Sequence, residues 1–236
     1  MKSWTRTLNL DDAHTLLAIS RPGMTRKQWE KVANKALGDS LSKARKNELT
    51  HLIRENFLDW EDGRLQANLF LAVYDQAPAE VQQELVDLHW ALSHPISLVA
   101  ADWLGTVLET GDPEVTLDQV DDLVAENLDT ESKQSQRKTR TILLKALENV
   151  GVMDNMGTGR HRQLKASRGA PSPLAFTYVL LRELAESGPR NVDTLAAESW
   201  ASRLTQCGVG HANRCIGWAI HANLVDQIDN DIKVVS

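Results

Sequence analysis

The sequence lacks the features that mark several classes of protein. Only two of its 236 residues are cysteine, Cys207 and Cys215, and they form no CxxC pair, which predicts a reduced chain with both thiols in the core. No apolar run approaches the roughly 20 residues of a membrane-spanning helix. The first residues, up to Asp12, lack the apolar region of a signal peptide. We therefore expect a cytoplasmic protein without a membrane partner.

Motifs for catalysis and metal binding are also missing. The chain has no GxxxxGK[ST] phosphate loop, no GxSxG elbow and no HExxH pair. Its histidines are scattered, and His89 and His94 have a spacing unsuited to zinc. Asp118, Asp121 and Asp122 share one helical segment, which is typical of a solvated face. We expect no enzymatic activity, no metal, no cofactor and no small-molecule substrate.

What the sequence does have is charge sorted along the chain. The formal net charge of −6 excludes a uniformly basic nucleic-acid coat, yet residues 21–54 hold nine basic and three acidic side chains, and residues 130–170 hold the same numbers. Between them, residues 55–129 contain Arg64 as their only base. Such sorting can create a local basic surface on an acidic protein, although solvated faces without a partner have the same pattern.

Helical periodicity dominates the chain up to Gly111-Asp112-Pro113. We expect helices that begin near Asn9, Thr25, Ser42, Leu65, Pro78 and Pro95, forming one helical domain over residues 1–112. Trp29, Trp103 and Trp218 fall on apolar helix faces, so we expect them in the core rather than stacked on bases.

After residue 112 the order of elements changes. A short helix capped by Thr116 precedes a helix from Ser132 to Val150, and two short segments around Gly157-Thr158-Gly159 suit a hairpin. This order predicts a winged helix-turn-helix module over residues 113–169. The predicted fold class is thus mainly α: an N-terminal helical domain followed by winged helix-turn-helix modules with short β-hairpin wings.

Residues 170–236 repeat that order as a second winged-helix-like module. Three predicted helices, PLAFTYVLLREL, NVDTLAAESWASRL and VGHANRCIGWAIHANLV, precede a hairpin of residues 225–228 and 232–235. Its candidate second helix has few cations, and its hairpin carries Asp226, Asp229 and Asp231. We interpret this module as facing protein or completing the core rather than as the main reader of DNA.

The helix after Ser132 has its densest cations at the end where the helix dipole disfavours them. DNA phosphates would supply the anion that this end favours, because a recognition helix enters the major groove N-terminus first. Arg137 and Arg140 can contact guanine or phosphate in a bidentate manner, and Gln134 and Gln136 can read adenine. The predicted DNA-binding residues are Lys133, Gln134, Ser135, Gln136, Arg137, Lys138, Thr139, Arg140, Arg160, His161, Arg162 and Lys165.

The chain resembles the BrxA family of BREX bacteriophage-exclusion systems. The resemblance covers nearly the whole chain and is carried by SQRKTRTILLKALENVGVM followed by a hairpin, by SPLAFTYVLLREL and by the terminal IDNDIKVVS. It implies a helical domain with winged-helix elements and a non-enzymatic accessory role in phage defence. The implied partners are double-stranded DNA and other proteins of the defence system.

Three functional hypotheses remain open from the residues. The first is a duplex-DNA-binding protein that uses the basic helix and wing, helped by the basic N-terminal helices. The second is an interaction scaffold or transcriptional regulator with the same fold, in which the acidic middle and the second module bind proteins. The third is an enzyme subunit without an active site of its own. Steep weakening by salt would distinguish phosphate contacts from protein docking.

Overall fold

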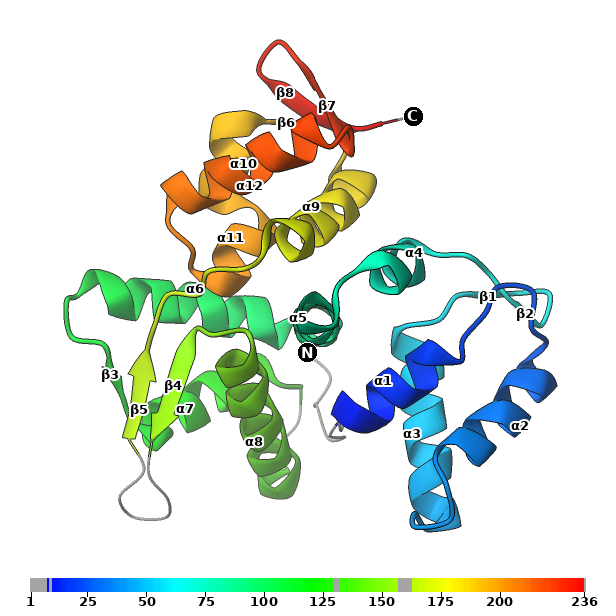
Figure 1. Cartoon of the computed structure of the whole chain (residues 1–236). Coiled ribbons are helices and arrows are strands. Elements are labelled where there is room, and N and C mark those ends of the chain that lie inside the picture. The colour runs from blue at the N-terminus through cyan, green and yellow to red at the C-terminus, as the bar shows by residue number, and fades with distance from the viewer. Residues whose placement is uncertain (1–7, 9, 130–131, 157–162, 236) are drawn as a thin grey trace. The chain divides into compact units, whose positions relative to one another are not determined.

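The computed structural model describes residues 8, 10–129, 132–156 and 163–235, and in it the chain is mainly α-helical with small antiparallel sheets (Figure 1). The chain forms two compact units, Thr7–Val86 and Asp87–Ser236. We expected a boundary at residue 112, but residues 87–112 belong to the same unit as everything after them.

The unit Thr7–Val86 is a small helical assembly around an aromatic and aliphatic core. Its elements are α1 (Leu10–Ala18), α2 (Arg26–Ala36), α3 (Lys43–Asn56), β1 (Trp60–Glu61), β2 (Arg64–Leu65), α4 (Leu69–Gln76) and the first half of α5 (Ala79–Leu92). Trp29 is fully buried and donates its indole N–H to the Ser20 hydroxyl over 2.9 Å. The rings of Phe57 and Phe70 pack edge to face at 5.2 Å.

The helix expected from Leu65 to Tyr74 begins later, at Leu69, with Asn68 as its N-cap. Leu65 instead pairs with Trp60 in the short β1–β2 hairpin. The connecting residues Asp62 and Gly63 have φ angles of 48° and 71°. Asp-Gly is a strong signal for such a left-handed two-residue turn, so this hairpin was readable from the sequence.

The unit Asp87–Ser236 contains two modules whose elements follow the same order, except that the second has one additional helix. The first module consists of α6 (Ile96–Glu109), β3 (Glu114–Val115), α7 (Leu117–Asn127), α8 (Lys133–Asn149), β4 (Met153–Met156) and β5 (Gln163–Ala166). The second module consists of α9 (Pro173–Ser187), β6 (Arg190–Asn191), α10 (Val192–Glu198), α11 (Trp200–Thr205), α12 (Val209–His221), β7 (Val225–Ile228) and β8 (Asp231–Val234). Their antiparallel sheets have the matching orders β3-β5-β4 and β6-β8-β7.

Two features of these modules differ from the expectation. The segment predicted as one helix from Asn191 to Leu204 is broken at Ser199, whose extended backbone ends α10 and whose hydroxyl caps α11. Ahead of the expected start of the first module, α6 packs on α8 and β5 and takes the place that α9 has in the second. The expected hairpin near the C-terminus is confirmed as β7 and β8.

Helix α6 also joins the two modules, which explains why they form one compact unit. Arg203 of α11 forms a bidentate ion pair with Asp102 of α6, with Nε 2.9 Å from Oδ1 and Nη2 2.5 Å from Oδ2. Gln206 donates to the backbone carbonyl of Ala101 over 2.8 Å. The connection between the modules is tight at Gly169, because a Cβ there would lie 2.9 Å from the carbonyl oxygen of Thr205.

Candidate nucleic-acid interface

Helix α8 is fixed in the first module by a strong apolar stripe. Ser132 caps its start by accepting the backbone N–H of Ser135 over 3.4 Å, and Gly151, with φ of 79°, follows its end. Leu143 and Leu147 are 0% and 1% exposed, which confirms the face predicted from their spacing. In Figure 1, α8 lies beside α7 and runs into the β4–β5 hairpin.

The first two turns of α8 present three free cations. Lys133, Arg137 and Lys138 are exposed, and none forms an ion pair with any residue that the structure describes. Gln134 is exposed beside them, and the first turn contains no acidic residue to offset the dipole. Unpaired N–H groups and cations therefore add to a local positive potential at this helix end.

Arg140, the second predicted guanine contact, has a structural partner instead. Its Nη1 lies 2.5 Å from Oδ2 of Asp121 on α7, and its side chain is 24% exposed. The pair ties α7 to α8, so Arg140 is not available in the way that Arg137 is. No sequence pattern indicates this pair, because its partners are 19 residues apart in the chain and meet only through packing.

The predicted phosphate contact of Thr139 is wrong, because its side chain is fully buried. Thr139 precedes Ile142 by three residues and Leu143 by four, which places it on the core face of the helix. Ser135 and Gln136 are half-buried beside that face.

In the β4–β5 hairpin, which was predicted to be a wing, the charge of Lys165 is offset by neighbouring acids. Lys165 of β5 is exposed, but its register neighbours are Asp154 on β4 and Glu114 on β3. Both acids share its face of the sheet, which weakens its attraction for phosphate. The other predicted wing contacts, Arg160, His161 and Arg162, lie outside the described residues.

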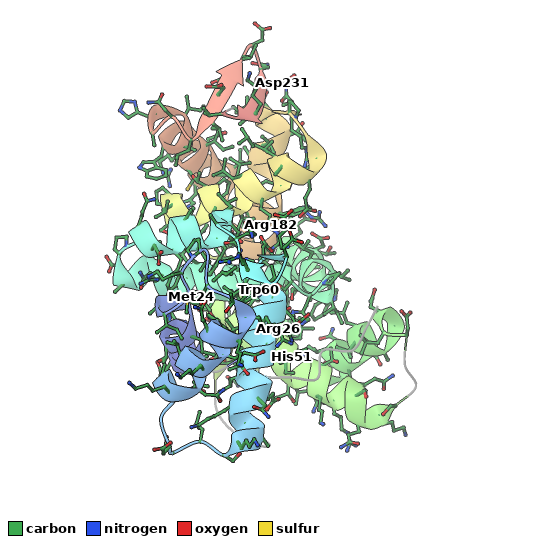
Figure 2. All side chains as sticks on the ribbon, turned by 90° about the vertical axis from the view of Figure 1, so that its right-hand side faces the viewer. Met24, Arg26, His51, Trp60, Arg182 and Asp231 are labelled. Atoms are coloured by element: carbon green, nitrogen blue, oxygen red, sulfur yellow. The ribbon has the colours of Figure 1, made fainter. Side chains whose placement is uncertain are left out.

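Helix α12 holds the equivalent place in the second module but has a different surface. Counting from each helix start, Val209, Asn213 and Arg214 correspond to the three cations of α8, and all are exposed. Trp218 is 39% exposed, so its predicted place in the core is wrong. Asp231 lies on the β7–β8 hairpin of this module, as Figure 2 shows.

Comparisons with family models, curated proteins and solved structures find no match to this chain. In the described part of the chain, no three or more His, Cys, Asp or Glu residues gather as a metal site would require. No single described helix has the length and apolar character to cross a membrane, and α5 with α6 passes that test only as a pair bent by 99°.

Proposed function

We propose that this chain is a non-enzymatic duplex-DNA-binding protein and that its first module is a winged helix-turn-helix. The observation that carries the proposal is the exposed, unpaired set of Lys133, Arg137 and Lys138 at the N-terminal end of α8. A helix end of this charge favours an anion, and duplex DNA offers a row of them.

The arrangement of elements supports the fold part of this proposal. The first module runs through a helix, a strand, two helices and a hairpin, as α6–β3–α7–α8–β4–β5. Its sheet has the strand order β3-β5-β4, so the third strand in sequence lies between the first and the second. In such modules the last helix is the one that enters the major groove, with its first residues at the bases. In this module that helix is α8, and those first residues carry the cations.

Each exposed polar or basic side chain at the start of α8 has a role in the proposed DNA contact. Arg137 can contact guanine or phosphate with two N–H groups, while Lys133 and Lys138 neutralise phosphates as point charges. Gln134 can donate to and accept from adenine. Arg140 would support these contacts by holding α8 against α7 through Asp121.

We further propose that the protein serves phage defence of the BREX type together with other proteins of such a system. This part rests on the resemblance to the BrxA family alone and stays a prediction. Its alternative, a protein-binding scaffold or a transcriptional regulator, draws support from the second module. Five large hydrophobic residues are more than a third exposed there: Val209, Trp218, Ile228, Val234 and Val235.

The direct test is a titration of labelled random-sequence duplex DNA at several salt concentrations. The variant is Lys133→Gln/Arg137→Gln/Lys138→Gln, which leaves the Arg140–Asp121 pair and the buried stripe intact. We expect the slope of log affinity against log salt to fall by about 0.9 per lost phosphate contact. The matched control is Lys145→Gln, a neutralised cation near the other end of the same helix.

Retention of the full salt slope by the triple variant would refute the assignment to α8. If Lys145→Gln lowers the salt slope by as much per removed charge, the effect of the triple variant would come from net charge alone and not from a site on α8. If the parent protein fails to bind the duplex DNA at every salt concentration, the result would favour the scaffold.

A further inference from the structure

A second basic surface lies on α2, in the other compact unit. Lys27, Lys31 and Lys35 recur every four residues, so their Cα atoms follow one side of the helix about 6 Å apart. All three are exposed. The opposite side of α2 is fixed by Trp29 and Ala33, both fully buried. We call these three residues the lysine stripe.

Most other cations of this unit have partners within it, whereas Lys43, at the start of α3, is exposed and forms no ion pair with a described residue. Arg26 and Arg54 both bind Glu30 at 3.2 Å, and Arg54 also reaches Nδ1 of His51 at 3.0 Å. Figure 2 labels Arg26 and His51, the two ends of this network between α2 and α3. Arg45 pairs with Glu48 within α3 at 2.8 Å.

The acids that could neutralise the lysine stripe are therefore already occupied. Glu30, three residues from Lys27, holds two arginines, and Asp39, four residues from Lys35, lies 3.6 Å from Lys46. None of the three lysines forms an ion pair with a described residue. Arg54 and Lys46 link α3 to α2, whereas the lysine stripe has no ion-pair partner within the described chain.

We propose that the lysine stripe is a second duplex-DNA contact, which binds the phosphate backbone without reading sequence. Flexible ammonium groups a helical turn apart suit a row of phosphates better than a single bidentate anion. The stripe includes no aromatic side chain, which argues against stacking on single-stranded bases. The apolar side of α2 is buried in the core, which argues against insertion into a membrane surface.

This inference rests on the proposed function and deepens it, because it assigns DNA contacts to both compact units. It concerns the charge of the stripe alone and is independent of how the two units are oriented. It also explains why this otherwise acidic sequence has two separate basic segments.

The experiment uses the full-length protein with Lys27→Gln/Lys31→Gln/Lys35→Gln, titrated with the same duplex DNA across salt concentrations. We expect the salt slope to fall by up to about 2.7, or roughly 0.9 for each lysine that neutralises a phosphate. The corresponding triple Lys→Arg variant should keep the parental slope, since it retains the charges. Glutamine and lysine have similar helix propensity, so the thermal melt should not change.

A control removes two cations elsewhere, Arg214→Gln/Lys233→Gln: Arg214 is exposed, and Lys233 is half-buried with Asp226 at 3.9 Å. An equal loss per charge in this control would overturn the stripe as a site. An unchanged slope in the stripe variant would overturn it too, while loss in the α8 variant would leave the proposed function standing. The reverse result, loss in the stripe variant alone, would support the stripe and refute α8.

Binding to anionic lipid vesicles is measured in parallel. If the parent binds vesicles through the stripe and ignores duplex DNA, the proposed partner is wrong. If it binds DNA and ignores vesicles, DNA is the partner.

Discussion

The two modules of the unit Asp87–Ser236 share a sheet order and, apart from one additional helix in the second, an order of elements, but they differ at the surface of one helix. On α8 the first, fifth and sixth residues are Lys133, Arg137 and Lys138. Counted from its own start, the first, fifth and sixth residues of α12, a helix of 13 residues against 17 in α8, are Val209, Asn213 and Arg214. Both helices bury one side in the core, so the fold demands little of these exposed positions.

In a repeated fold, function can be located at the exposed positions where the two copies differ. Core positions are constrained by packing in both modules, whereas exposed positions are free to diverge. The free cations of α8 are electrostatically unfavourable for the isolated helix, and α12, which has Arg214 in its first two turns, carries less of that cost. A feature that opposes local stability and occurs in one copy alone is the stronger indication of a ligand.

The largest effect should come from the shared feature, the buried stripe. Leu147→Ala in α8 and Ile216→Ala in α12 each truncate a side chain that is 1% exposed. We expect each to lower the free energy of unfolding by about 2–5 kcal/mol, measured by urea denaturation. A loss in one helix without a comparable loss in the other would break the equivalence of the two cores.

Acid should weaken both modules together, through a histidine just before α6. Burial lowers the pKa of His94 from 6.5 to about 4, against a hydrogen bond to the Trp90 carbonyl that raises it. The folded state thus binds fewer protons than the unfolded state between these pH values, so stability is full above about pH 6.5 and falls as pH drops toward 4. The loss should approach about 3 kcal/mol.

The measurement is the free energy of unfolding between pH 7 and 4.5, compared with His94→Gln. The variant should have a flatter pH dependence than the parent. Hydrogen exchange should increase in α8 and α12 alike, because α6 contacts both modules. An increase confined to one module would show that α6 does not couple them.

Local pattern was enough to predict much of this architecture. Apolar periodicity predicted α8 and its buried face, and alternation predicted the β7–β8 hairpin. The β1–β2 hairpin was missed despite its Asp62-Gly63 signal. Thr139 was misassigned because only apolar residues were counted in the stripe, although its spacing places it there.

Other features depend on packing between distant segments and had no local signal. The unit boundary is set by α6, which serves the first module and also holds α11 through Asp102 and Arg203. The Arg140–Asp121 pair requires α7 and α8 to be already in place. For the candidate site, sequence therefore identified the cations but not which of them are free.

Moving the cations sharpens the comparison between the modules. In a protein that already carries the neutralised α8, Val209→Lys/Asn213→Arg recreates the α8 pattern on α12, next to the existing Arg214. We expect a partial recovery of DNA affinity, about tenfold or less, because the hairpin of this module carries Asp226, Asp229 and Asp231. The salt titration measures it, and an absent recovery would show that more than surface charge separates the two helices.

The smallest effect concerns Arg140, whose ion pair decides whether it belongs to the scaffold or to the interface. With its two side chains 24% and 41% exposed, the pair should contribute under about 1 kcal/mol to the free energy of unfolding. Asp121→Asn and Arg140→Gln should therefore cost little each, and the double variant should cost less than their sum, because both remove the same contact. In the DNA titration Arg140→Gln should weaken binding less than Arg137→Gln does. Tighter binding by Asp121→Asn, together with additive stability losses, would contradict the scaffold role: the carboxylate would then restrain a DNA contact rather than hold α7 against α8.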